Sequence, residues 1–312
     1  MSVRLVAFRP VIRGTPVLLH CNFALIYEAV FMMVSSLAIK FGMKHDIIIS
    51  VGIILGSFFL SKSGATGEEA NLYVIRYIDV DRVNAKEFED AVAEKTKKFN
   101  RSEDSDQWFT HKILTGPRTG QYARWFGPKT WTDLDNPEST HRITPGATAS
   151  HKEAVYWQEN ILPLEKEAGN NEIWMVVPGT SFSNFAEDQP RKYEAIYRWK
   201  IKPGMYQRKT AQDIKLTKAI QASEFKIQGH VARLVSGGDY MTFGNAIAFN
   251  SWEEYGKFRA WEGMGDVFDK VHGKGAWKKF LKEHNAIMQE GGETEGEFWE
   301  YLEDLSSLEL SK

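Results

Sequence analysis

One order of predicted strands and helices occurs twice in this chain, at a spacing of about 120 residues. The first copy opens with the segment 71–77 and the second with the segment 192–198. Both segments are rich in the aromatic and β-branched residues that favour strands. In each copy a helix, a β-hairpin, a second helix and a closing strand-like segment follow in the same order. The chain is therefore expected to fold into two similar halves of mixed α and β structure.

The limits of the two copies follow from the residues between them. We place the first copy at residues 70–178 and the second at residues 192–305. The segment 179–191 is rich in Gly, Ser, Asn, Asp and Pro and shows no periodicity, which is typical of a linker. The predicted organisation is thus two α+β repeats joined by a short connection.

Each copy contains a predicted hairpin whose turn is marked by glycine. The first hairpin turns at residues 116–120 and the second at residues 237–238, because glycine tolerates the backbone angles of tight turns. Aligning the two hairpins pairs His111 with His230. It also brings Tyr122 and Tyr240 to matching positions, as the last residues of Gly-Gln-Tyr and Gly-Asp-Tyr.

A hydroxyl residue followed by tryptophan comes after each hairpin. These pairs are Thr130-Trp131 and Ser251-Trp252. A Ser or Thr in this place predicts the N-cap of a helix. Because tryptophan buries a large apolar area, both Trp131 and Trp252 are expected to lie in the core.

The order strand, helix, strand, strand, helix, strand is that of a ferredoxin-like βαββαβ unit. Two such units in one chain resemble the dimeric α+β-barrel superfamily, whose members include antibiotic-biosynthesis-type monooxygenases, ring isomerases, haem-degrading enzymes and chlorite-dismutase-like haem proteins. The resemblance covers residues 70–305 and rests on element order alone. It implies an intramolecular α+β barrel made by an internal pseudo-dimer, so that the protein acts as a monomer. It also implies a ligand cleft between the sheet and the helices of each copy.

Residues 1–66 form a separate apolar region, expected to be helical. The run 16–39 follows three arginines, which is typical of a membrane span with a cytoplasmic basic flank. A second run, 47–60, follows Lys44 and ends in small residues, which matches a secretory signal peptide that starts at Met43. On this interpretation the residues before Met43 come from a misassigned start, and the globular part is exported to the periplasm or cell envelope. The alternatives are an uncleaved membrane anchor and an ordinary pair of buried helices.

The overall composition excludes some partners and cofactors. With 39 basic and 41 acidic residues the formal net charge is -2, so the chain has no general attraction for nucleic acid. The single cysteine, Cys21, lies in the apolar region, so the repeats can form neither an internal disulfide nor a thiolate metal site. We also find no phosphate loop, dinucleotide-binding glycines or paired-histidine zinc helix, and predict no metal site.

Histidines and tyrosines supply the candidate site residues. His111 and His230 are predicted catalytic residues, because a strand histidine beside a cavity can act as a general base or bind haem iron. Four further residues are candidates for ligand binding, through hydroxyl hydrogen bonds or ring nitrogens: Tyr122, Tyr240, His141 and His284. Each also has a structural interpretation, as a hydrogen-bonded side chain of a strand, turn or core.

We expect an exported or envelope-anchored protein that binds a small, largely apolar ligand, and the sequence does not identify its specific activity. Two classes of function remain open. The first is an enzyme, either a cofactor-free monooxygenase or isomerase, or a haem-dependent enzyme if haem is present. Without a sequence signature for haem, no cofactor is the default expectation. The second is a non-catalytic binding or structural module whose clefts are filled by its own Trp and Phe side chains. A polar cavity would favour the first class and a filled core the second.

Overall fold

The computed structural model describes residues 71–102, 105–135, 152–166, 170–186, 190–260, 263–292 and 295–310. The predicted signal peptide, its alternatives and the start at Met43 fall in the N-terminal region, which lies outside these residues. His141 lies in the stretch 136–151, which is also outside them. These predictions therefore stay predictions. Within the described ranges, no helix combines the length and the apolar character that crossing a membrane requires.

The described strands form one antiparallel sheet that closes on itself. Their order is β4-β1-β3-β2-β9-β6-β8-β7, and an additional pairing of β4 with β7 completes a barrel of eight strands. The ninth strand, β5, pairs with the end of the same β7 edge. Closure satisfies the backbone groups that an open sheet would leave unpaired at its edges. The predicted α+β barrel is therefore confirmed.

Each half supplies four barrel strands together with the helices that cover them. The first half consists of β1 (Leu72–Ile78), α3 (Ala85–Phe99), β2 (Trp108–Ile113), β3 (Tyr122–Lys129), α4 (Trp131–Leu134), α6 (Lys152–Asn160), η1 (Leu162–Leu164) and β4 (Asn171–Val176). After β5 (Phe182–Ser183), the second half consists of β6 (Tyr193–Lys200), α7 (Tyr206–Gln221), β7 (Gln228–Ser236), β8 (Thr242–Phe249), α8 (Trp252–Arg259), α9 (Met264–His272), α10 (Ala276–Ile287), β9 (Glu295–Tyr301) and η2 (Glu303–Leu305). The strand order within the halves is β4-β1-β3-β2 and β9-β6-β8-β7. The two halves therefore share one strand order.

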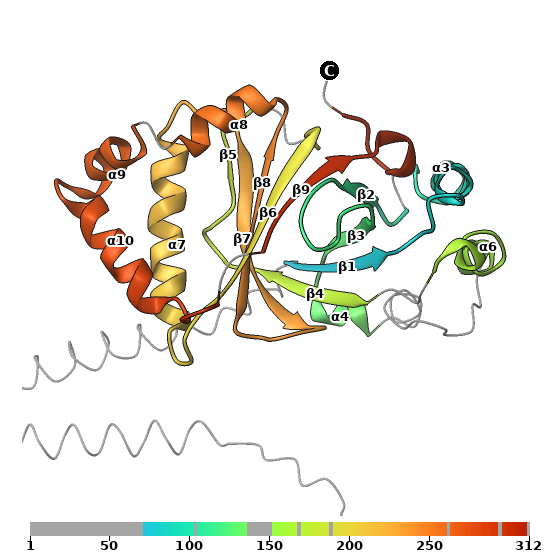
Figure 1. The fold of residues 1–312 in the computed structure, drawn as a ribbon, viewed down its shortest axis with the longest axis horizontal. Coiled ribbons are helices and arrows are strands. Elements are labelled where there is room, and N and C mark those ends of the chain that lie inside the picture. The colour runs from blue at the N-terminus through green and yellow to red at the C-terminus, as the bar shows by residue number, and fades with distance from the viewer. Residues whose placement is uncertain are drawn as a thin grey trace, which may run out of the picture. The chain divides into compact units, whose positions relative to one another are not determined.

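The helices of the two halves lie on opposite sides of the barrel. Figure 1 shows α3 and α6 beside the strands of the first half, and α7, α9 and α10 beside those of the second. Buried apolar side chains fill the layers between sheet and helices, with Phe88 and Val92 on one side and Phe249, Phe268 and Phe280 on the other. These clusters occupy the layers in which the resemblance placed the ligand clefts.

The two closing strands carry the same short motif in the same role. Glu172 and Trp174 in β4 correspond to Glu297 and Trp299 in β9. In each strand the indole Nε1 donates a hydrogen bond to the carboxylate two residues earlier, over 2.8 Å in β4 and 2.9 Å in β9. The motif therefore marks equivalent positions in the two halves.

This equivalence corrects the predicted pairing of the two histidines. Tyr301 in β9 and Val176 in β4 match each other, because each lies two residues after the tryptophan of the motif. His111 lies opposite Tyr301 in the β2–β9 ladder, and Ala232 lies opposite Val176 in the β4–β7 ladder. Ala232 is therefore the equivalent of His111. His230 lies two residues away on the same strand and, because side chains alternate along a strand, on the same face.

The error arose from the choice of turn glycine. The matching residues are Gly116 and Gly237, which have φ angles of 91° and 93°. Each packs against the closing strand of the other half, because a Cβ atom would lie 2.7 Å from the Gly296 oxygen at Gly116 and 2.2 Å from the Asn171 oxygen at Gly237. With these glycines aligned, Tyr122 no longer corresponds to Tyr240.

The helix starts after the hairpins were predicted correctly, but the burial of their tryptophans was not. The side chains of Thr130 and Ser251 both accept a hydrogen bond from the backbone N–H three residues later, as N-caps do. Trp131 is nevertheless 48% exposed and Trp252 44% exposed. A side chain in the first turn projects beyond the layer that the rest of the helix covers, so the core prediction for both rings was wrong.

Candidate functional site

A cavity of about 510 Å³ lies inside the barrel and is lined by residues from all eight barrel strands. Because side chains alternate along a strand, every second residue faces inward, as Tyr73, Ile75 and Tyr77 do on β1. The wall is largely aromatic, with rings from Tyr73, Tyr77, Phe109, Trp125, Trp174, Trp299 and Tyr301. Its size and apolar character are those of a site for a small molecule.

Three titratable side chains meet in this cavity. His111 comes from β2, Glu194 from β6 and His230 from β7. The Nε2 atom of His111 lies 3.6 Å from the nearer Glu194 carboxylate oxygen. His111 is only 1% exposed, and neither of its ring nitrogens has a hydrogen-bond partner among the described residues. A buried polar group without a partner is costly, so this arrangement is suited to a ligand that supplies one.

The charges of the cluster are set by its surroundings. Burial alone would raise the pKa of Glu194, but the neighbouring His111 and, to a smaller extent, His230 outweigh this and hold it below its ordinary value. Burial lowers the pKa of His230, and the Glu194 carboxylate only partly opposes this. Near neutral pH, Glu194 is therefore ionised while His230 is neutral. A neutral imidazole beside a carboxylate can accept a proton.

Aromatic rings hold the two histidines in place. Tyr73 stacks on His230, with ring centroids 5.7 Å apart and planes 12° from parallel. Trp125 lies nearly parallel to His111 at 6.2 Å and to Phe109 at 4.1 Å. The rings therefore restrict the orientation of both imidazoles.

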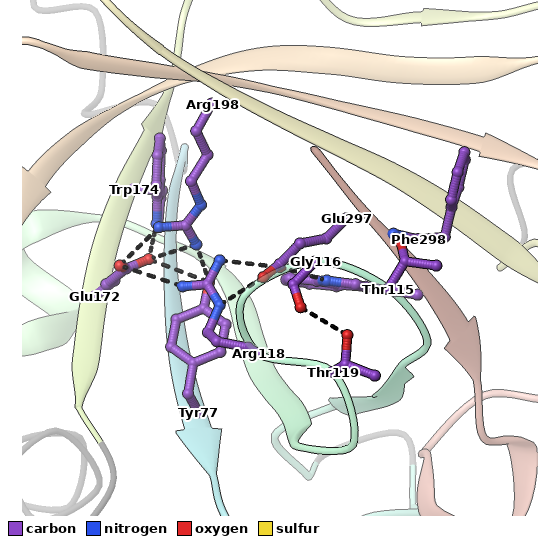
Figure 2. A network of polar contacts seen from close by, with 11 residues as sticks. Tyr77, Thr115, Gly116, Arg118, Thr119, Glu172, Trp174, Arg198, Glu297 and Phe298 are labelled. Carbon is purple, nitrogen blue, oxygen red and sulfur yellow. Dashed lines mark hydrogen bonds and ion pairs between the residues drawn. The ribbon is translucent and has the colours of Figure 1, made fainter. Parts of the chain in front are cut away.

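Ion pairs between the two halves adjoin the cavity, whose lining includes Arg198 and Tyr77 (Figure 2). Arg198 donates to both carboxylate oxygens of Glu172, over 2.8 and 3.0 Å. Arg118 makes the same kind of double contact with Glu297, with two distances of 2.9 Å. Tyr77 donates to Glu172 over 3.1 Å. Burial, followed by the charge of Glu172, raises the pKa of Tyr77, so this phenol stays protonated and acts as a donor.

The structure brings together only two of the predicted site residues. His111 and His230 both line the cavity. Tyr122 points to the outer face of the sheet, where it packs on Phe88 and donates to Glu89 over 2.5 Å. Tyr240 lies in the β7–β8 turn and is 69% exposed. Strand alternation places Tyr122, and turn position places Tyr240, away from the cavity that His111 and His230 line.

His284 also lies away from the cavity, on α10. Its ring is near those of Phe280, at 6.0 Å, and Trp199, at 6.5 Å. Burial and then the charge of Lys209 lower the pKa of His284 to about 4. These contacts indicate a structural histidine, the alternative that the sequence left open.

Replacing His284 by leucine should make stability less dependent on pH between 6.5, the ordinary pKa of histidine, and about 4. In that range the unfolded chain binds a proton that the folded chain does not, so the wild type loses stability as pH falls. Leucine removes this contribution. Urea unfolding at pH 7 and pH 5 measures the effect, with His272→Leu on the neighbouring α9 as the control. An equal loss of stability in wild type and His284→Leu would contradict the assignment.

Two of the three described candidate histidines, His111 and His284, are poorly placed to bind haem iron. An axial histidine needs space for the iron next to its free ring nitrogen. The Nε2 atom of His111 faces the Glu194 carboxylate, Tyr73 covers one face of His230, and His284 lies outside the cavity. Within the described part of the chain, no group of three or more His, Cys, Asp or Glu residues could hold a metal ion.

Sequence reasoning missed Glu194 and the arginine–glutamate pairs. A weak signal was present, because Glu194 and Arg198 alternate with Ile196 in a predicted strand and so share one face with it. Charged residues on the inward face of a buried strand are unusual and call for partners. The partners themselves lie on strands far away in the chain.

These features define an α+β-barrel protein with a ligand-sized, partly polar cavity inside the barrel. No family model and no curated protein matches the chain. Among solved structures it is similar to a protein of Fusobacterium nucleatum that is provisionally named a monooxygenase, with 8% identity, 75% of this chain and 93% of that chain covered, and a TM-score of 0.49. A provisionally named monooxygenase of Lactobacillus acidophilus shows 10% identity, coverage of 75% and 94%, and a TM-score of 0.46. A chlorite dismutase of Candidatus Nitrospira defluvii shows 10% identity, coverage of 78% and 97%, and a TM-score of 0.46.

Proposed function

We propose that this chain binds one small, largely apolar molecule inside its barrel, and that His111, Glu194 and His230 exchange a proton with it. The observation that carries the proposal is the buried His111 ring in an aromatic cavity, whose Nε2 atom lies 3.6 Å from the Glu194 carboxylate and whose Nδ1 atom has no hydrogen-bond partner among the described residues. A ligand hydroxyl or carbonyl would supply the missing hydrogen bond. The aromatic wall would hold the rest of the molecule.

The roles of the three residues follow from their charges. His230, whose pKa burial lowers, accepts the proton from an acidic O–H or C–H of the ligand. Glu194 then stabilises the imidazolium that forms. His111 donates a ring N–H to the ligand oxygen that becomes negative. Removal of such a proton is a first step shared by isomerases and cofactor-free monooxygenases, which makes an enzyme of this kind our preferred function.

The proposal can be tested with 4-nitrophenol, whose visible absorption comes from the ionised form. The wild type is expected to bind the phenol and to increase the ionised fraction at a pH where the free phenol is mostly neutral. His230→Gln should lower the ionised fraction of the bound phenol, because the group that accepts the proton is lost. Calorimetry measures binding separately. His272→Gln, the same exchange outside the cavity, is the control.

Each outcome of this test is informative. If the wild type does not bind the phenol, the proposed cavity function is wrong. Binding without a change in ionisation, or with a change that His230→Gln leaves intact, would indicate a binding module that moves no proton. Loss of both binding and ionisation in His272→Gln would show a general effect on the fold.

We also propose that the two halves are tandem ferredoxin-like copies of one ancestral unit. Support comes from residue pairs that recur at one spacing from β1 to α8, among them Ile75 and Ile196, Gln107 and Gln228, Gly116 and Gly237, and Trp131 and Trp252. The shared hydrogen bond of the two closing strands supports it independently. The proposal fails if these pairs do not coincide when the halves of an experimentally determined structure are superposed.

A further inference from the structure

The wall of the cavity departs from the symmetry of the two halves at several positions. Some equivalent positions carry the same side chain, such as Ile75 and Ile196. At three of the pairs that differ, the first half has an aromatic ring where the second has a polar or small residue. These pairs are Tyr73 with Glu194, Phe109 with His230, and Trp125 with Ala246.

The strand order places the two sets on different sides of the barrel. β1, β3 and β2 are neighbours in the sheet, and β6, β8 and β7 are neighbours in the other half. The side formed by β6, β8 and β7 therefore carries Glu194 and His230 next to small side chains, and the side formed by β1, β3 and β2 carries aromatic rings together with His111. A ligand bound between them would have a single orientation.

Ala246 is the position at which this difference changes the available space most. It replaces the indole of Trp125 by a methyl group, and it lies directly opposite His230 in the β7–β8 ladder. Ala246 faces the inside of the barrel and is still only half-buried. The neighbouring Gly244 differs, since a Cβ atom there would lie 3.0 Å from the ring of Trp174. Gly244 thus makes room for a protein side chain, whereas Ala246 borders the cavity.

We infer that Ala246 determines the size of the ligand that this chain accepts, by leaving open beside His230 the space that Trp125 fills in the other half. The inference rests on the proposed function, because it concerns the same cavity. It assigns the ligand's ring system to the volume above Ala246 and its polar edge to His230 and Glu194. Larger side chains at this position should exclude fused rings before they exclude a single ring.

The test compares two phenols of different size, phenol and 2-naphthol, by calorimetry. Along the series Ala246→Val, Ala246→Leu and Ala246→Phe, the Kd of 2-naphthol is expected to rise stepwise, by about tenfold or more at phenylalanine. The Kd of phenol should stay within about threefold of the wild type for the valine and leucine variants, because a single ring needs less of the space. The double variant Trp125→Ala with Ala246→Trp conserves the total side-chain volume. It should bind 2-naphthol more weakly than the wild type, because the tryptophan fills the space next to His230.

The outcomes separate this inference from the proposed function. If the wild type binds neither phenol, the proposed function itself fails. If it binds both, and the Kd of 2-naphthol stays constant in variants with the circular dichroism spectrum of the wild type, the inference about Ala246 is wrong. If the larger substitutions disturb the fold, two smaller changes test the inference: Ala246→Val, which reduces the cavity, and Ala246→Gly, which enlarges it. These two variants must shift the preference between the two phenols in opposite directions.

Discussion

The Arg198→Met variant is expected to lose about 3 to 5 kcal/mol of the free energy of unfolding, the cost of removing one partner of a buried ion pair. The side chains of Arg198 and Glu172 are each 11% exposed, and both carboxylate oxygens of Glu172 accept from the guanidinium. Methionine keeps the apolar stem but leaves a charged carboxylate buried between the two halves. Urea unfolding followed by circular dichroism measures the loss.

A matched control lies on the same strand. Lys200 on β6 pairs with Asp239 over 3.1 Å, and the two side chains are 45% and 44% exposed. Lys200→Met removes a pair that water already screens, so the expected change is below about 1 kcal/mol. The double variant Arg198→Met with Glu172→Gln should recover part of the loss, because it no longer buries an unpaired charge. Equal effects of Arg198→Met and Lys200→Met would show that the network of Figure 2 contributes little to joining the halves.

The Gly116→Ala variant is expected to lose about 2 to 5 kcal/mol, the sum of a left-handed backbone and a steric clash. The φ angle of 91° disfavours any side chain. The new Cβ atom would also lie 2.7 Å from the Gly296 oxygen at the start of β9. Since that backbone belongs to the other half, the clash should weaken the β2–β9 junction. The same unfolding experiment measures the change.

Gly120 in the same turn separates the two contributions. Its φ angle is 92°, but a Cβ atom there would meet nothing within 4 Å. Gly120→Ala should therefore cost only the backbone term, about 1 to 2 kcal/mol. The difference between the two variants measures the contact between the halves. If both lose the same free energy, the close approach of Gly116 to β9 is unimportant for stability.

Both predictions concern junctions that local sequence patterns do not describe. The barrel closes where β2 meets β9 and where β4 meets β7. At each junction the strands come from different halves, and their residues are distant in the chain. Pairings of this kind depend on the whole topology and carry a large loop-closure cost until neighbouring strands have formed.

The sequence by itself determined the order of strands and helices, the helix starts at Thr130 and Ser251, and the closed α+β architecture. Turns, N-caps and strand-like segments are local signals, read from residues close together in the chain. The histidines His111 and His230 were also recognisable, because few side chains can exchange protons near neutral pH.

Only the tertiary structure decided which residues form the site. Glu194 lies beside His111 because β9 pairs with β2 on one side and with β6 on the other. Tyr122 and Tyr240 lie away from the cavity because of their sheet face and their turn position. The location of the cavity inside the barrel, rather than under the helices, was decided in the same way. The physical reason is that register and inward orientation are properties of paired strands. A shift of two residues in register keeps the local alternation of side chains. It nevertheless changes the residue equivalent to His111 from Ala232 to His230.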